Sequence, residues 1–136
     1  MRPLSPEHPD DEIFDGLLIV RTEGRLFFVN AQHVAEQINA LIMQYKPRVI
    51  ALDMSRVPDI EYSALQMLME GEKRGSERGA IVWLAGLNPG VLEIVRRAGL
   101  ADRLGRERML FNASVAIERY QLLEAKAGGM EKSAVP

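Results

Sequence analysis

Length, composition and charge limit this chain to one ordinary globular domain. Its 136 residues are 47% hydrophobic and 26% charged, which suffices for one core and not for two. The 17 basic and 19 acidic residues give a net charge of -2, and no basic stretch with interleaved aromatics points to nucleic acid. The chain has no cysteine, which excludes disulfides and thiolate chemistry, and no apolar run approaches the length of a membrane span or signal peptide.

The first structured element is predicted to be a hairpin that follows a tether. Residues 1–14 contain three of the seven prolines and several acidic residues, a composition typical of a linker. Residues 17–22 (LLIVRT) are predicted to form a strand, and residues 25–29 (RLFFV) its antiparallel partner. Gly24 supports this turn because glycine readily takes a positive φ.

A helix and a buried strand are predicted next. Asn30 is a candidate helix cap, and apolar residues then recur at helical spacing up to Pro47: Val34, Ile38, Leu41, Ile42 and Tyr45. Residues 49–52 (VIAL) form a continuous apolar run, which is typical of a strand covered on both faces, with Asp53 at the sheet margin. The short connections favour an open α/β layer.

The turn after this strand is predicted to carry the functional residues. Pro58 in loop 55–60 separates the strand from a helix whose apolar face begins at Ala64. Ser63 and Gln66 fit a capping box, which places Ser63 in or near the first helical turn. The positive end of the helix dipole would favour a phosphate on this hydroxyl.

The remaining chain repeats the alternation of strands and helices. A strand is predicted over 80–85, a helix from Pro89 to Gly99, a short strand over 109–111, and a last helix capped by Asn112. The core face of that helix comprises Ala113, Ala116, Ile117, Tyr120 and Leu123. The prediction is an α/β domain over residues 15–125, with a mixed four- to five-stranded sheet flanked by about four helices, and a disordered tail over 126–136.

Several runs resemble the STAS domain, which SulP-family sulfate transporters share with anti-sigma factor antagonists. The resemblance covers about residues 15–121 and includes Leu52-Asp53-Met54-Ser55, residues 60–65 (IEYSAL) and residues 24–31 (GRLFFVNA). It implies a single STAS-like layer and places Ser63 where the antagonists carry their phosphorylated residue. Glu61, Tyr62 and Ala64 depart from the family's usual Asp, small residue and Gly.

The resemblance implies a non-enzymatic cytoplasmic domain that regulates a SulP-like sulfate or anion transporter at the inner face of the cell membrane. Its partner would be the membrane part of the transporter or a soluble regulatory protein, with homodimer formation as a further option. The alternative is a stand-alone anti-sigma factor antagonist switched by phosphorylation of Ser63. The run at 26–31 favours the transporter branch, whereas the intact Ser63 favours the antagonist.

Seven residues form the predicted partner or ligand loop: Asp53, Ser55, Asp59, Glu61, Tyr62, Ser63 and Asn88. Tyr62 is the predicted principal contact, and Ser63 is either a phosphoacceptor or only a helix cap. The carboxylates are interpreted as solvated loop groups rather than metal ligands or an acid/base pair. No cofactor is expected; a weak nucleotide or anion site would lie where loops 53–62 and 86–90 meet.

Two other patterns bear on function. An aspartate at a strand end also occurs in response receivers, but the acidic pair and lysine that they need are missing at 22–24 and 111–112. The chain also lacks the Gly-rich motifs of dinucleotide and P-loop sites. Five arginines cluster in sequence and are interpreted as solvated surface or as a face toward anionic lipid or an acidic partner: Arg96, Arg97, Arg103, Arg106 and Arg108.

Overall fold

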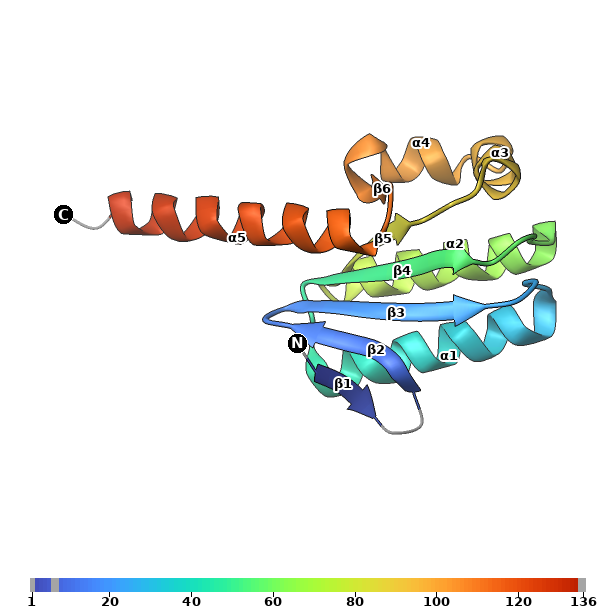
Figure 1. The fold of residues 1–136 in the computed structure, drawn as a ribbon, viewed down its shortest axis with the longest axis horizontal. Coiled ribbons are helices and arrows are strands. Elements are labelled where there is room, and N and C mark those ends of the chain that lie inside the picture. The colour runs from blue at the N-terminus through green and yellow to red at the C-terminus, as the bar shows by residue number, and fades with distance from the viewer. Residues whose placement is uncertain (1, 6–7, 135–136) are drawn as a thin grey trace.

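The structure is a computed structural model that describes the backbone of residues 2–5 and 8–134 and the side chains of residues 13–126. Within these ranges one mixed sheet has the strand order β1-β2-β3-β4-β5-β6 (Figure 1). Its strands are β1 (Arg2–Ser5), β2 (His8–Phe14), β3 (Leu17–Glu23), β4 (Val49–Arg56), β5 (Ile81–Ala85) and β6 (Met109–Leu110). β2 pairs antiparallel with both β1 and β3, and β3 to β6 are parallel.

Helices cover both faces of this sheet. They are α1 (Phe28–Tyr45), α2 (Tyr62–Glu77), α3 (Pro89–Arg97), α4 (Leu100–Leu104), the 3-10 turn η1 (Arg106–Arg108) and α5 (Ala113–Ala134). Residues of α1 to α4 share one core with the sheet, whereas α5 packs on the opposite face and then runs past the end of the strands (Figure 1). The predicted class, a single α/β layer with a mixed sheet, is confirmed.

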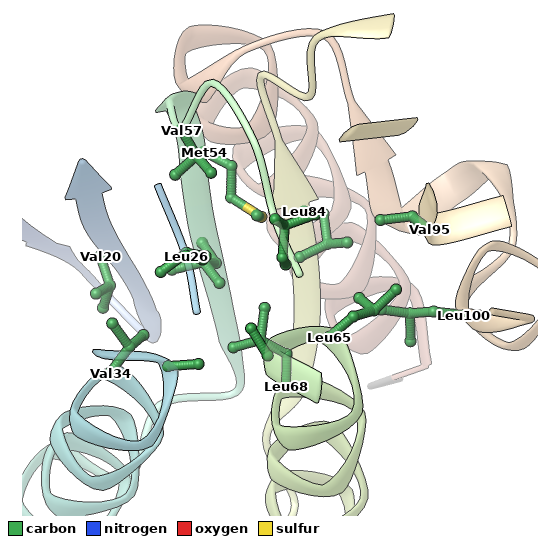
Figure 2. Packing of buried hydrophobic residues seen from close by; sticks show 14 of the residues in the cluster. Val20, Leu26, Val34, Met54, Val57, Leu65, Leu68, Leu84, Val95 and Leu100 are labelled. Atoms are coloured by element: carbon green, nitrogen blue, oxygen red, sulfur yellow. The ribbon is translucent and has the colours of Figure 1, made fainter. Parts of the chain in front are cut away.

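Strand β4 lies at the centre of the fold, as its apolar run predicts. Ile50 and Leu52 join the core beneath α1 to α4, and Val49 and Ala51 join the core beneath α5. Met54 is also buried, and Figure 2 shows it near Val57. This burial explains why β4 continues to Arg56 rather than ending at Asp53.

The antiparallel hairpin differs from the predicted one. β3 pairs with β2 through a turn at Gly16, whose φ is 88°, and Phe14 lies opposite Leu17. The prediction of a tether over residues 1–14 is therefore wrong for β1 and β2, while residues 1, 6 and 7 lie outside the described part. The prolines at 3 and 9 fall on the edge strand and near a strand start, where a missing N–H is tolerated.

The segment predicted as the second hairpin strand instead leads into α1. The side-chain oxygen of Asn30 accepts a hydrogen bond from the Phe27 N–H at 2.7 Å, and its amide donates to the Arg25 carbonyl at 2.7 Å. Asn30 was predicted as the cap of this helix, but Phe27 is the N-cap, and Asn30 bonds back to it from the third helical position. The strand predicted over 25–29 is wrong because these reciprocal bonds begin a helix at Phe28.

The last helix begins as predicted and runs further. The Asn112 side chain accepts a hydrogen bond from the Val115 N–H at 2.9 Å, and the Tyr120 hydroxyl donates to the Asp15 carbonyl at 2.7 Å. Burial, followed by the neighbouring Glu124, raises the pKa of Tyr120 above its ordinary value. Leu123, predicted to face the core, is exposed.

The disordered tail predicted over 126–136 is also wrong within the described residues, because α5 continues to Ala134. Five of the nine residues from 126 to 134 are alanine, glutamate or lysine, and adding such residues to an existing helix is favourable, whereas Gly128 and Gly129 oppose it. None of the helices in residues 8–134 combines the length and apolar character needed to cross a bilayer.

Candidate interaction site

Two loops at the carboxyl end of the parallel strands are joined into one support. The Gly24 N–H donates to the Arg56 carbonyl at 2.9 Å, and Leu26 exchanges backbone hydrogen bonds with Asp59 and Glu61 at 3.0 and 2.9 Å. Leu26, Val57 and Ile60 are buried beneath these bonds, and Figure 2 shows Leu26 and Val57 in the same core. The starts of α1 and α2 are therefore held side by side.

Charged side chains occupy the rim of this support. The Arg25 guanidinium lies 3.2 Å from an Asp59 oxygen and 3.5 Å from a Glu61 oxygen. All three side chains are largely exposed, so these pairs add little stability. Glu61 is the N-cap residue of α2, where a carboxylate interacts favourably with the helix dipole.

Large apolar side chains gather beside this rim. Phe27, Phe28 and Val29 at the start of α1 are 43%, 48% and 54% exposed, and Tyr62 at the start of α2 is 59% exposed. We call these four residues the aromatic face. Such clustering on a rigid support is typical of a recognition surface. The aromatic face was not predicted from the sequence, because residues 27–29 were assigned to a strand. Asn30, which marks the start of a helix, is the residue that could have indicated it.

Ser63 lies in the first turn of α2, as predicted, and its side chain is half-buried. The capping-box prediction is wrong: Glu61 occupies the N-cap position, and no side chain among the described residues caps this helix. The hydroxyl is therefore near the positive end of the helix without being committed to a cap.

Asp53 lies beneath the candidate surface. It is only 7% exposed, one oxygen lies 3.3 Å from Arg21 Nε, and the other accepts a hydrogen bond from the Ser55 N–H at 3.0 Å. These contacts tie the ends of β3 and β4 to the following turn. Ser55 is exposed on the side of that turn facing β5 and α3.

The Asn88 side chain joins loop 55–60 to the start of α3. Its side-chain oxygen accepts a hydrogen bond from the Val91 N–H at 2.8 Å, and its amide donates to the carbonyls of Val57 and Pro58 at 3.1 and 3.2 Å. Of the seven predicted residues, the fold therefore gathers Asp59, Glu61, Tyr62 and Ser63 at the start of α2. The other three support or flank them.

These contacts predict different effects for two conservative truncations. Asn88→Ala is expected to lower the free energy of unfolding by about 2 kcal/mol, because it removes a helix cap and two loop hydrogen bonds. Ser63→Ala, its control, is expected to change that free energy by less than about 0.5 kcal/mol. Urea titration followed by circular dichroism measures both. Equal losses in the two variants would contradict this assignment of the cap.

Most of the arginine cluster is engaged in ion pairs. Glu72 is only 4% exposed, and its oxygens lie 2.6 Å from Arg103 Nε and 3.4 Å from Arg108 Nη1. Arg97 pairs with Glu93 at 3.1 Å on α3. Within the described residues, no group of three His, Asp or Glu side chains is placed to hold a metal ion.

Known proteins match this chain in sequence. The family model of the STAS domain matches residues 8–116. Sulfate transporter 3.1 of Arabidopsis thaliana is 29% identical over an alignment of 125 residues that covers 82% of this chain and 19% of that protein. The chain thus spans about a fifth of the length of this relative.

Solved structures match the fold. The crystal structure of a sulfate transporter family protein from Wolinella succinogenes has a TM-score of 0.70 and 27% identity, covering 83% of this chain and 92% of that chain. The anti-sigma factor antagonist SpoIIAA in its unphosphorylated form has a TM-score of 0.68 and 17% identity, covering 82% and 94%. The second likeness concerns the fold alone. The resemblance predicted from the sequence is confirmed.

Proposed function

Because the chain belongs to the STAS domain family, we propose that it is a non-enzymatic regulatory and interaction domain of a SulP-like sulfate or anion transporter. It would act at the cytoplasmic face of the membrane, bound to the membrane part of the transporter or to a soluble regulator. The aromatic face is the observation that carries this proposal. It places four large apolar side chains in solvent on a hydrogen-bonded support.

The chemistry of the surface fits such a partner. Cytoplasmic loops of membrane proteins are rich in lysine and arginine. The exposed carboxylates of Asp59 and Glu61 beside the aromatic face are complementary to basic side chains, while the face itself would bury apolar ones.

The same contacts support binding rather than catalysis. A general acid or base needs a carboxyl group that is free to exchange a proton with a substrate. Asp53 is engaged by Arg21 and by the Ser55 N–H, and Asp59 and Glu61 are engaged by Arg25. The loop thus offers a shaped surface and no obvious proton-transfer pair.

The flanking genomic sequence provides a direct test of the transporter assignment. A preceding reading frame, in the same gene or adjacent to it, is expected to encode about ten apolar spans of roughly 20 residues. Neighbouring frames without membrane spans would contradict the assignment to a transporter.

A binding experiment tests the surface. The double variant Phe28→Ser/Tyr62→Ser is expected to weaken binding to the transporter's membrane part, held in nanodiscs, by at least about tenfold. Phe111→Ser is the matched control, because Phe111 is an exposed aromatic outside the aromatic face. Unchanged affinity in the double variant, or equal loss in the control, would contradict the proposed surface.

A second function is supported by the position of Ser63. An antagonist would be switched by phosphorylation of this half-buried hydroxyl at the positive end of α2. Mass spectrometry of the protein isolated from its own host tests this alternative. A phosphate on Ser63 supports it, whereas an unmodified Ser63 in both growing and starved cells would contradict it.

A further inference from the structure

An open groove lies on the other side of loop 55–60 from the aromatic face. It holds about 1040 Å³ between the ends of β4 and β5, helices α3 and α4, and the start of α5. That volume is at the upper end of the range for small-molecule sites, about 300 to 1,000 Å³. Its principal side chains are Leu87, Leu92, Arg96, Arg106, Met109 and Phe111.

Two arginines give the groove a cationic side. Arg96 comes from α3 and Arg106 from η1, and both line the groove. Within residues 13–126 neither of them forms an ion pair or a side-chain hydrogen bond, unlike Arg97, Arg103 and Arg108. Asp102 is the acidic residue in the lining, so cationic groups outnumber anionic ones. Unpaired guanidinium groups are strong donors to carboxylates, sulfonates and phosphates.

Apolar side chains also line the groove. Phe111 follows β6 directly and is 85% exposed, more than any other large apolar residue whose side chain is described. Leu92 and Met109 line the same space. An exposed phenyl ring facing a lined groove provides a surface on which a planar or aliphatic group can stack.

We propose that this groove binds an amphiphilic organic anion. Arg96 and Arg106 hold its sulfonate, carboxylate or phosphate group, and Phe111 and Leu92 contact its apolar or aromatic body. An inorganic anion would bind only to the two arginines, and a neutral apolar molecule would contact only Phe111 and Leu92. The groove does not share the aromatic face, so this proposal stands independently of the proposed function.

Titration of the ¹⁵N-labelled protein with 2-naphthalenesulfonate tests the proposal. Saturable shifts are expected at the amides of Gly86, Leu87, Gly105 and Phe111, which belong to the groove. Inorganic sulfate has only the anionic group and neutral 2-naphthol only the aromatic body. Both are expected to bind at least about tenfold more weakly. Sulfate or 2-naphthol binding as tightly as the sulfonate would overturn the amphiphilic assignment.

Substitutions test the contributions of the arginines and of Phe111 separately. Arg96→Gln/Arg106→Gln is expected to weaken naphthalenesulfonate binding at least about tenfold, and Phe111→Ser by several-fold. Arg97→Gln makes the same change on α3 outside the groove and is expected to retain the parent affinity. Because all these side chains are exposed or half-exposed, the folded spectrum should persist. Absence of saturable groove shifts up to about 10 mM, or equal binding by the double variant, would overturn the proposal.

Discussion

Replacing Leu65 by alanine is expected to lower the free energy of unfolding by about 3 kcal/mol, because it leaves a cavity in a closely packed core. Leu65 is fully buried at the start of α2 and belongs to the same core cluster as Leu52 and Leu84. Figure 2 shows Leu65 and Leu84 in this core. Leu65 lies only three residues after the exposed Tyr62. Substitutions at these two positions therefore compare a core residue with a surface residue in the same helical turn.

Tyr62→Ala provides the control for this substitution. Its side chain is exposed, and the variant is expected to keep the parent stability within about 0.5 kcal/mol. Urea unfolding followed through Trp83 fluorescence measures both variants. A loss below about 1 kcal/mol for Leu65→Ala, or a loss of similar size for Tyr62→Ala, would contradict the division between core and surface.

Gly86→Ala is expected to cost about 3 kcal/mol, from backbone strain and from close contact together. The φ of Gly86 is 75°, and an added Cβ would lie 2.9 Å from Ser55 Cβ and 3.1 Å from Asp53 Oδ1. The substitution would therefore push apart the ends of β4 and β5, where the turn after Asp53 is fixed. Thermal or urea unfolding gives the loss in stability.

Gly79→Ala isolates the backbone contribution. Gly79 has a φ of 84°, but an added Cβ would meet nothing within 4 Å. Its substitution is expected to cost about 1 kcal/mol through strain alone. Equal costs for the two alanine variants would contradict the close packing of Gly86 against Asp53 and Ser55.

The central part of the fold could be predicted because its signals are local. The apolar run at 49–52 has the length and composition of a buried strand, and Pro58 marks the break before α2. Pro89 likewise marks the start of α3 and occupies the predicted first helical position, directly after Asn88, which is the N-cap. Each of these residues acts through neighbours a few positions away.

The errors arose where distant segments decide the structure. Leu26 was predicted to lie in the second strand of a hairpin but instead bonds to the loop around Ile60. Glu72 is buried because Arg103 and Arg108 reach it from a later helix and turn. Glu72 lies in a stretch of charged residues, so the sequence does not indicate that it is buried and paired with distant arginines. The proline content of residues 1–14 similarly led to the prediction of a tether where β1 pairs with β2 and β2 pairs with β3.

The candidate site was predicted in part for the same reason. The positions of Tyr62 and Ser63 follow from the start of one helix, so the sequence indicated them. The aromatic face required two helix starts to be brought together by backbone hydrogen bonds between separate loops. The burial of Asp53 similarly depends on Arg21 from a neighbouring strand and on Gly86, which directly follows another strand.

One titration tests the central claim, that the aromatic face and the start of α2 bind the partner. The ¹⁵N-labelled domain would be titrated with the proposed partner, the membrane part of a SulP-like transporter in nanodiscs, and amide shifts would be followed residue by residue. Shifts and broadening are expected at residues 27–29 and 59–63. Shifts confined to residues 96–108, with the amides of 27–29 and 59–63 unmoved, would show that the partner binds a different surface.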